Sequence, residues 1–368
     1  MNKYATRAIA SLIAPSTLRV GVKNLCLCLN LDQCNLRCIM CWQTYDREAN
    51  RQRHQVTNMS RENLLGLLRN VALKDATISV VGGGEPFLYP HLEDLLREAT
   101  VGGRRLMIMT NGTLLHHYPI FWKIAEQANI TMMFSMDAAS AETYAQIRPP
   151  GHWSDLTANI ERFVSLRQKN PDLQISTSFV VLKQNLPELL DFMQLNVIWK
   201  SNYVHIHPAI QGAFPDEWCI NRRDPEYVEI IRECFALAQE NSISMDLPEE
   251  LVPEELVSSI TQGPLKSSPT SLAQRLSSGW RLPAEDPRWS CSKHTTDMTV
   301  TVAGDIYLCD TAFRVYYPCG NVFESGFMKT WLSKPWLSVR LAHVLGTQDR
   351  HYLCSKCLLI HDRIELAE

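Results

Sequence analysis

The sequence lacks a strong charge of either sign. Its formal net charge is −3 over 368 residues, and no long block of like charge occurs along the chain. Binding to nucleic acid depends on a basic surface that neutralises phosphates. We therefore expect no nucleic acid among the partners of this protein.

Long apolar runs are also absent. A membrane-spanning helix needs about 20 mostly apolar residues, and no stretch approaches that length, so we expect no membrane span. Residues 9–14 follow Lys3 and Arg7 and faintly resemble a signal peptide, but this run is short and is closed by Pro15. We interpret it as a short amphipathic helix packed on the fold, with peripheral membrane contact as the alternative, and we expect a cytoplasmic protein.

Cysteine, in contrast, is plentiful, with 12 residues. In a chain without a convincing export signal, intracellular reductants keep thiols free, which argues against a framework of disulfide bonds. Metal binding is therefore the leading interpretation of the cysteines.

Short apolar runs alternate with segments of helical period from about residue 24 to residue 210. This alternation is typical of a parallel sheet covered by helices. We predict six strands, at residues 25–31, 77–81, 106–110, 130–136, 175–182 and 203–207, and helices at residues 61–71, 91–99, 119–128, 156–167 and 186–199. Six βα units close only part of a barrel, so the predicted fold class is α/β, a partial (βα)6 TIM-like barrel with an open side.

The composition and the periodicity of the sequence change after a further predicted helix at residues 226–240 and a short apolar run at 243–247. Residues 248–290 are rich in Pro, Ser, Glu and Leu and show no sustained period. Beyond them, the pattern predicts a strand pair at 298–302 and 306–308 and a helix near 327–344. The predicted domains are an N-terminal extension (1–23), the barrel (24–247), a linker or loop-rich insertion (248–290) and a small α+β domain (291–368) lying across the open side.

Three cysteines follow the first predicted strand with the spacing C-x3-C-x2-C: Cys34, Cys38 and Cys41. Loops at the carboxyl ends of parallel strands are where such folds place their chemistry. Three thiolates on a four-iron cluster leave one iron open to another ligand. The spacing alone also fits a zinc site or a fragment of a ferredoxin.

Further motifs come after successive predicted strands, in order. They are Gly82-Gly83-Gly84-Glu85-Pro86, then Thr110-Asn111-Gly112, then Ser135-Met136-Asp137 with Arg148 beyond it. Together with the cysteine triad, this order resembles the radical S-adenosylmethionine (SAM) superfamily over most of the predicted barrel. The resemblance implies an enzyme in which a 4Fe–4S cluster on Cys34, Cys38 and Cys41 cleaves SAM to a 5′-deoxyadenosyl radical.

The resemblance also implies which residues surround SAM. Met40 would lie near the adenine. The run Gly83, Gly84, Glu85 and Pro86 would approach the amino group, which either the Glu85 carboxylate or backbone carbonyls can accept, because glycine allows close approach of the backbone.

Four polar residues would complete the implied SAM site. Asn111, Ser135 and Asp137 would lie around the ribose and carboxylate, with the serine and the acid suited to hydroxyl groups. The forked guanidinium of Arg148 suits the carboxylate. Each also has a plainer interpretation alone: a turn at Asn111, a helix cap at Asp137 and a surface cation at Arg148.

A second set of cysteines lies in the last part of the chain: Cys291, Cys309, Cys354 and Cys357, with Gly304 between the first two. The order C-x12-G-x4-C followed by C-x2-C resembles the auxiliary-cluster extensions called SPASM and twitch. A full SPASM module carries further cysteines, and none follows Cys357, so the implied arrangement is the single-cluster twitch type of the aminocyclitol dehydrogenase in butirosin biosynthesis. A closed 4Fe–4S cluster serves electron transfer; a structural zinc knot is the alternative.

Other candidate catalytic groups are weaker. Cys319 and Cys219 lie in loop-like sequence, and a thiol there could return a hydrogen atom to a substrate radical, so we take Cys319 as a candidate hydrogen donor. Asp310 and His294 lie beside auxiliary cysteines and are candidate bases. Both also fit solvated turn residues.

The reaction expected from this resemblance is oxidation or epimerisation of a sugar, an aminocyclitol or a related secondary metabolite. The alternative is maturation of a peptide or protein by formation of a thioether, a cyclophane or a formylglycine. A non-enzymatic zinc-binding or electron-carrier protein is the alternative from another class. The family also implies a flavodoxin- or ferredoxin-type electron donor.

Overall fold

The protein is built around one curved sheet of nine strands in the order β7-β6-β5-β4-β3-β2-β1-β8-β9. Our computed structural model describes residues 22–31, 33–45, 56–209, 215–221, 223–247, 252–253, 296–309, 317–344 and 351–354. The strands are β1 (Asn24–Leu27), β2 (Thr77–Val80), β3 (Leu106–Thr110), β4 (Ile130–Ser135), β5 (Gln174–Val181), β6 (Tyr203–Pro208), β7 (Ser244–Asp246), β8 (Asp297–Val300) and β9 (Ile306–Tyr307). Neighbours from β7 to β8 are parallel, and β9 is antiparallel to β8.

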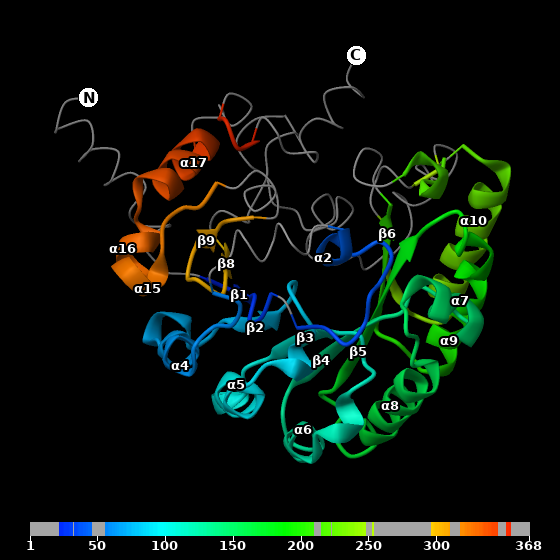
Figure 1. Cartoon of the computed structure of the whole chain (residues 1–368), viewed down its shortest axis with the longest axis horizontal. Helices are drawn as coiled ribbons and strands as arrows, with labels where there is room; N and C mark the ends of the chain where they lie inside the picture. Colours follow the sequence, from blue (N-terminus) through cyan, green and yellow to red (C-terminus); the bar gives the residue numbers. More distant parts are fainter. Residues whose placement is uncertain are drawn as a thin grey trace.

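Helices cover the convex side of this arc (Figure 1). The α-helices of the barrel region are α2 (Trp42–Tyr45), α4 (Arg61–Leu68), α5 (Leu92–Ala99), α6 (Pro119–Ala125), α7 (Ala141–Ile147), α8 (Trp153–Leu166), α9 (Leu189–Ile198) and α10 (Pro225–Glu240). The C-terminal region adds α15 (Val322–Ser325), α16 (Phe327–Trp331) and α17 (Lys334–Val344). Short α2 is the exception to this placement, because it follows the cysteine loop on the concave side (Figure 1).

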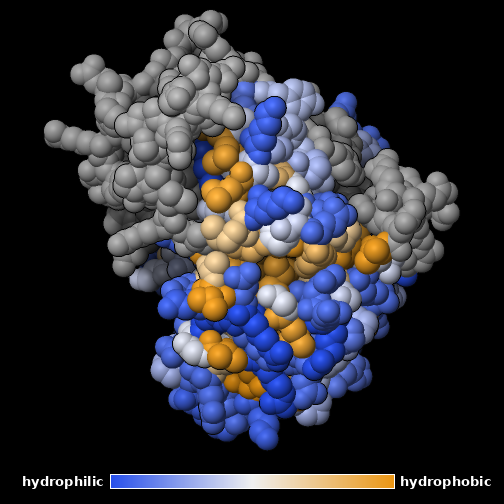
Figure 2. Space-filling view, turned by 90° about the vertical axis from the view of Figure 1, so that its left-hand side faces the viewer, coloured by the Kyte–Doolittle hydropathy of each residue, from blue (hydrophilic) through white to orange (hydrophobic). Residues whose placement is uncertain are grey.

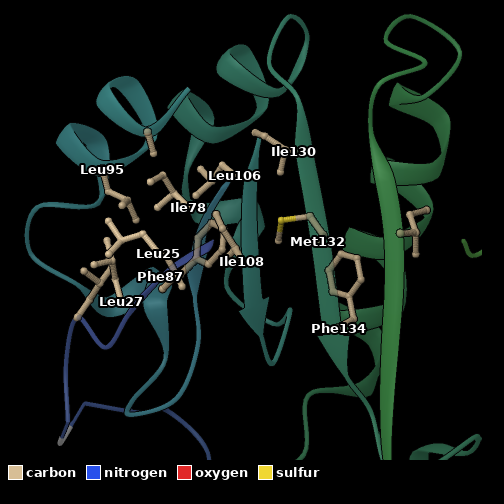
Figure 3. Packing of buried hydrophobic residues seen from close by; sticks show 14 of the residues in the cluster. Leu25, Leu27, Ile78, Phe87, Leu95, Leu106, Ile108, Ile130, Met132 and Phe134 are labelled. Atoms are coloured by element: carbon tan, nitrogen blue, oxygen red, sulfur yellow. The ribbon is translucent and has the colours of Figure 1, made fainter. Parts of the chain in front are cut away.

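The core lies between the sheet and its outer helices. Alternate residues of each strand point the same way, so the apolar ones collect on the helix side, as Figure 3 shows for β1 to β4 together with Phe87 and Leu95. One continuous cluster runs from Leu25 in the barrel to Trp331 and Trp336 in the C-terminal region. The two regions therefore share a core.

The inward face of the sheet carries polar side chains together with apolar ones such as Met109, Met133 and Val180. On the strands from β4 to β7 the residues between the core positions include Thr131, Ser135, Ser176, Ser178 and His205. A barrel wall lined with hydroxyls and imidazole suits a polar ligand better than a packed apolar interior.

All six predicted strands are present with ends shifted by at most four residues. The short apolar run at 243–247 forms a further parallel strand, β7, which we did not predict as part of the sheet. The helix α7 was also not predicted. The helix expected near 327–344 is two helices, because Pro335 starts a new one within the first turn of α17.

We predicted the C-terminal domain across the open side of the barrel, and the described strands show where it joins the sheet. The strand β8 pairs in parallel with β1, with Leu25 opposite Met298 and Leu27 opposite Val300. This pairing satisfies backbone groups that an edge strand would leave open. The C-terminal region is therefore attached at the β1 edge of the barrel sheet.

Apolar and polar side chains both reach the described surface of the C-terminal region. Figure 2 views the side on which α15 to α17 lie in Figure 1, where apolar groups alternate with polar ones. Exposed apolar residues of this region include Met328, Leu332 and Leu337, and isolated residues of this kind are ordinary. Among the described residues, no helix is long and apolar enough to cross a membrane.

Candidate active site

The cysteine triad lies on the loop that joins β1 to α2. Cys34, Cys38 and Cys41 are all partly exposed free thiols. Two backbone hydrogen bonds fasten this loop to the end of α7 and the residues that follow it: Arg37 N–H donates to the Pro149 carbonyl at 2.6 Å and Ile39 N–H to the Ile147 carbonyl at 2.9 Å. The loop is thus held against the rim of the barrel with its thiols accessible.

Hydrogen-bond donors approach two of these thiols. Leu36 N–H lies 3.4 Å from Sγ of Cys34, and Nδ2 of Asn111 lies 3.9 Å from the same sulfur. Nη1 of Arg148 lies 3.6 Å from Sγ of Cys38. Donors of this kind stabilise thiolates, the form in which cysteine binds metals.

Burial opposes the thiolate form in the protein without its metal. It raises the pKa of Cys34, against the effect of the Leu36 N–H. It also raises the pKa of Cys38 to about 11, and the charge of Arg148 works in the opposite direction. No three His, Cys, Asp or Glu side chains in the described parts of the chain gather as ligands of one metal ion. The thiols of a cubane each bind a different iron, so a site for a cluster does not need such convergence.

The glycine motif lies directly against the segment that precedes the triad. A Cβ on Gly83 would lie 2.0 Å from the Asn30 carbonyl oxygen, and one on Gly84 would lie 2.2 Å from the Gln33 carbonyl oxygen. Gly83 also has φ +77°, a conformation that favours glycine. Only glycine permits this contact, so the motif brings its backbone next to the cysteine loop.

Backbone carbonyls remain available at this contact. Gly84 N–H donates to the Asn30 carbonyl and Glu85 N–H to the Gln33 carbonyl, both at 2.7 Å. Within the described residues, no donor reaches the carbonyl oxygens of Gly83 or Gly84. Those oxygens are free acceptors beside the triad. Pro86 is buried and starts the short 3-10 turn Pro86–Leu88 that ends the motif.

Both oxygens of the Glu85 carboxylate are already used inside the protein. Oε1 accepts from Thr110 Oγ1 at 2.6 Å and from Phe87 N–H at 3.1 Å, and Oε2 accepts from Asn111 N–H at 2.9 Å. Burial raises the pKa of Glu85, and these bonds counteract it. Glu85 therefore ties the end of β2 to the end of β3.

Asn111 connects the third strand to the cysteine loop. Its Nδ2 donates to Oδ1 of Asn35 at 2.8 Å, and its Oδ1 accepts from Thr113. The predicted site residues from the first and third strands are therefore in contact.

Asp137 and Arg148 form a buried ion pair. Nε and Nη2 of Arg148 lie 2.7 and 2.5 Å from Oδ2 of Asp137, whose side chain has no exposed surface. Oδ1 accepts the Val180 N–H at 2.7 Å. Asp137 also adopts φ +60°, the left-handed region, and the buried Asn185 donates to its carbonyl. We expected this carboxylate to bind a ribose hydroxyl, but its oxygens are occupied by protein donors.

Ser135 and Met40 differ in exposure: Ser135 is partly exposed, whereas Met40 is buried. Ser135 is the last residue of β4, is partly exposed, and pairs in register with Ser178 of β5. Met40 forms a small apolar cluster with Ile147, Leu182 and Cys219 beside Cys38. This cluster forms an apolar wall next to the triad.

Of the second cysteine set, the described residues are Cys309 and Cys354; Cys291 and Cys357, like Asp310 and His294, lie outside the described part of the chain. Cys309 is partly exposed after β9 and Cys354 is buried. Gly304, with φ +91°, forms the turn between β8 and β9, where a Cβ would lie 2.3 Å from the Phe323 ring. The glycine of this motif is therefore required for packing.

Cys319 is fully buried, and burial raises the pKa of its thiol to about 12. Its N–H donates to the Ile306 carbonyl, as part of the structure that carries β9. Its sulfur is enclosed in the core cluster. The geometry therefore favours a packing role for Cys319 over the predicted role of hydrogen donor.

Several residues of the site were not found from the sequence. Asn30 donates to the Glu85 carbonyl at 2.9 Å and so joins β1 to the glycine motif. Glu188 accepts four bonds from the start of α7. His205, His207 and Asp246 face the barrel interior. A polar residue inside an apolar run was the available signal for Asn30, and two histidines in alternation were the signal on β6.

Comparison with known protein families gives two matches. The model of the radical SAM superfamily matches residues 31–196, and the model of the iron–sulfur cluster-binding domain SPASM matches residues 291–358. The first match includes the triad and every predicted SAM residue, and the second includes all four auxiliary cysteines.

Curated relatives match only part of the chain. An AdoMet-dependent heme synthase of Methanosarcina barkeri is 31% identical over 216 residues, 58% of this chain and 58% of the relative. A tungsten-containing aldehyde ferredoxin oxidoreductase cofactor-modifying protein of Pyrococcus furiosus is 31% identical over 44% of this chain and 45% of its own length. The chain thus spans about half the length of these relatives.

Solved structures share the fold over almost the whole chain. Streptococcus suis SuiB bound to precursor peptide SuiA has a TM-score of 0.62 at 15% identity, over 98% of this chain and 76% of SuiB. The enzyme anSMEcpe with bound AdoMet and a peptide has a TM-score of 0.55 at 16% identity, over 91% of this chain and 86% of its own. This chain therefore combines a radical SAM domain at residues 31–196, with SAM and a 4Fe–4S cluster as its cofactors, and an auxiliary iron–sulfur domain of the SPASM type at residues 291–358.

Proposed function

We propose that this radical SAM enzyme removes a hydrogen atom from a sugar, an aminocyclitol or a related polar metabolite and oxidises or epimerises it. The observation that supports this proposal is a row of polar side chains that crosses the inward face of the sheet from β4 to β7. Hydroxyl groups of Ser135 and Ser178, the imidazoles of His205 and His207 and the carboxylate of Asp246 lie on adjacent strands there. A polyhydroxylated ligand needs many such partners.

The site residues have distinct proposed roles. Cys34, Cys38 and Cys41 would hold the cluster, and the free carbonyls of Gly83 and Gly84 would accept the SAM ammonium. When bound here, the cluster and SAM supply a 5′-deoxyadenosyl radical that takes a hydrogen atom from the substrate. Glu85 would support the glycine motif from behind.

Other residues would fix the rest of SAM. Ser135 and Asn111 would face the ribose and carboxylate, and Met40 would contact the adenine. Arg148 would contribute positive charge near both the SAM carboxylate and Cys38, with Asp137 holding its guanidinium in place. In this proposal Asp137 acts through Arg148 and makes no direct contact with the ribose.

The C-terminal region would provide an acceptor for the second electron of an oxidation. Cys291, Cys309, Cys354 and Cys357 would hold an auxiliary 4Fe–4S cluster. We also propose a flavodoxin- or ferredoxin-type donor that reduces the first cluster. The attachment of β8 to β1 supports this scheme, since the auxiliary region and the triad follow neighbouring strands.

A second candidate is modification of a peptide. SuiB with its precursor peptide and anSMEcpe with bound peptides share this fold over most of the chain. Their identity to this chain is low, so they support the candidate only through architecture. A peptide substrate would place backbone amides against the same row of polar side chains.

Anaerobic reconstitution with iron and sulfide tests the radical SAM reaction. We expect iron and sulfide corresponding to two 4Fe–4S clusters per chain and release of 5′-deoxyadenosine from SAM after reduction with dithionite. A variant with Cys34, Cys38 and Cys41 all changed to Ala should lose both the SAM cleavage and the iron of one cluster. Bound zinc, or bound iron without SAM cleavage, would refute the proposal.

The substrate class is tested by stimulation of SAM cleavage. Hexoses, amino sugars and cyclitols form one panel, and synthetic peptides form the other. Mass spectrometry in D2O then separates the outcomes: oxidation removes two hydrogens, whereas epimerisation incorporates one solvent deuterium. Stimulation by peptides alone would favour the second candidate.

A further inference from the structure

Two histidines of β6 point into the barrel. Val204 and Ile206 are fully buried in the core on the helix side. Because side chains alternate along a strand, His205 and His207 face the opposite side. Their rings are nearly parallel, with centroids 6.3 Å apart and an interplanar angle of 5°.

An aspartate of the next strand supports the first histidine. Asp246 of β7 is in register with His205, and its Oδ2 lies 3.5 Å from Nδ1 of His205. The interaction with His205 lowers the pKa of Asp246, so this group is a carboxylate at neutral pH. A carboxylate at Nδ1 orients an imidazole, and this pair does not use the other ring nitrogen.

A short chain of contacts joins this group to the triad. His207 is in register with Val180 of β5. Val180 N–H donates to Asp137, which holds Arg148, which in turn lies 3.6 Å from the sulfur of Cys38. Val180 therefore connects His207 to the ion pair of Asp137 and Arg148, and Arg148 lies next to Cys38.

His207 is exposed on the inward face of β6 and neutral at pH 7. Desolvation by the groups packed around the ring, and the neighbouring His205, lower its pKa, while Asp246 and the more distant Asp137 act in the opposite direction. These are the charged groups that face it from β6, β7 and the end of β4; Asp137 is itself paired with Arg148. A neutral imidazole with open access can accept a proton.

A metal-binding role does not fit this cluster. His205, His207 and Asp246 all belong to the described chain, and no group of three such side chains there is arranged to hold a metal ion. Two imidazoles and a carboxylate on this face of the sheet can take part in hydrogen bonding and proton transfer.

We propose that His205, His207 and Asp246 form a substrate subsite in which His207 accepts a proton from a hydroxyl group of a sugar or cyclitol. This inference rests on the proposed function, since it acts on the substrate radical. The O–H bond breaks, the proton moves to a ring nitrogen of His207, and the bonding electron pair stays on oxygen. The deprotonated substrate radical would then become a carbonyl by losing one electron to the auxiliary iron–sulfur cluster of the proposed function. His205, fixed by Asp246, hydrogen-bonds a neighbouring hydroxyl.

The first test measures coupling in the reconstituted enzyme. Carbon-deuterated myo-inositol, D-glucose and D-glucosamine are each added with SAM and dithionite, and 5′-deoxyadenosine and oxidised product are quantified. With a polyol that stimulates SAM cleavage, the wild type should form nearly one product per 5′-deoxyadenosine. His207→Gln should still yield deuterated 5′-deoxyadenosine, but with product reduced about 10²-fold, the size of a typical acid–base contribution.

The matched control is His152→Gln. His152 also lies near an aspartate, with Nδ1 3.8 Å from Asp155 Oδ2, but on the exposed start of α8. His152→Gln should form as much product per 5′-deoxyadenosine as the wild type. Unchanged coupling in His207→Gln would overturn the subsite. Failure of all three polyols to stimulate, while unstimulated SAM cleavage proceeds, would also overturn it and would leave the radical SAM reaction intact.

Asp246 is a positioning residue and has its own readout. Removing its charge in Asp246→Asn should lower the pKa of His207, because this carboxylate favours the protonated ring. The acid limb of the coupling–pH profile should therefore move to lower pH. An unmoved profile would exclude Asp246 from the subsite.

A second readout does not depend on the cofactors. Diethyl pyrocarbonate modifies neutral, accessible imidazoles, and mass spectrometry locates the label. His207 of the folded chain should be labelled, and the stimulating polyol should protect it while His152 stays reactive. Equal labelling of His207 with and without that polyol would count against binding at this wall.

Discussion

Nη1 of Arg148 lies 3.6 Å from Sγ of Cys38, while Nε and Nη2 of the same guanidinium hold the Asp137 carboxylate. One side chain thus joins a cysteine of the triad to the carboxyl end of β4. Positive charge and hydrogen bonds near a cluster sulfur stabilise the reduced state. Arg148 is therefore placed to set how easily the cluster takes up an electron.

Replacing Arg148 should make the first cluster harder to reduce. In Arg148→Met we expect the midpoint potential to fall by roughly 40–60 mV, equivalent to about 1 kcal/mol for a one-electron couple. Arg148→Lys keeps the positive charge and should therefore lower the midpoint potential by less. Redox titration followed by electron paramagnetic resonance measures this, with Arg97→Met on the exposed face of α5 as the control. Equal potentials in Arg148→Met and the control would refute the role.

Removing the carboxylate of the buried ion pair between Asp137 and Arg148 should destabilise the fold. Asp137→Ala leaves the guanidinium buried without its partner, which costs about 3–5 kcal/mol. The double variant Asp137→Asn with Arg148→Met has no unpaired charge and should recover much of that loss. Urea denaturation of the three proteins checks this. A double variant no more stable than Asp137→Ala would mean that the pair is not the source of the effect.

The positions of the six barrel strands and the cysteine triad were predictable because their signals are local. Apolar runs fix where strands form, and the motifs after them fall at the same edge of a parallel sheet. The detailed roles were not predictable in the same way. Glu85 and Asp137 match motif positions, but only the structure shows that their carboxylates are bound by the protein's own N–H and O–H groups.

The position of the C-terminal region depended on pairing over a long distance in sequence. Residues 297–300 form a strand whether or not they join the barrel, and the sequence carries no signal for which edge they extend. The shared core explains the outcome, since Met298 and Val300 continue the apolar layer of Leu25 and Leu27. Long-range register of this kind is set by packing.

Gly83 should be intolerant of a side chain. Gly83→Ala combines a positive φ with a Cβ 2.0 Å from the Asn30 carbonyl oxygen, so the glycine motif must move away from the cysteine loop. Gly102→Ala is the matched control, with φ +68° and open space around it, and should cost only the strain of about 1–2 kcal/mol. We expect SAM affinity, measured by calorimetry on the reconstituted protein, to fall in Gly83→Ala and to be unchanged in Gly102→Ala. Equal affinity in both would argue against close approach of this backbone to SAM.

Cys319 should be replaceable without loss of chemistry. Its buried thiol packs in the core, so Cys319→Ala should lose about 1 kcal/mol of stability from the small cavity. Iron content and the ratio of product to 5′-deoxyadenosine should match the wild type. A variant that cleaves SAM but no longer completes turnover would restore the role of hydrogen donor.

Glu188 should make stability depend on pH at the acid end. Its oxygens accept from the N–H groups of Ala139 and Ser140 and from the hydroxyls of Ser140 and Thr143. Burial raises the pKa of Glu188, but these bonds outweigh it and leave the pKa below its ordinary value. A carboxyl whose pKa is lower in the folded than in the unfolded state stabilises the protein above its unfolded pKa, near 4.3. That contribution disappears as pH falls through the folded pKa.

At pH 7, Glu188→Gln should therefore lose about 1.5–3 kcal/mol of unfolding free energy, the range for hydrogen bonds to a charged group. The difference from the wild type should shrink as the pH falls below about 4, because the wild-type carboxyl then also becomes protonated. Urea denaturation at pH 7, 5 and 3.5 measures this dependence. Glu142→Gln, which removes an exposed carboxylate in the first turn of the same helix α7, is the control. It should lose only the interaction with the helix dipole, about 0.3–1 kcal/mol. A loss in Glu188→Gln that is the same at all three pH values would show that the side chain stabilises α7 by its shape, without a contribution from its charge.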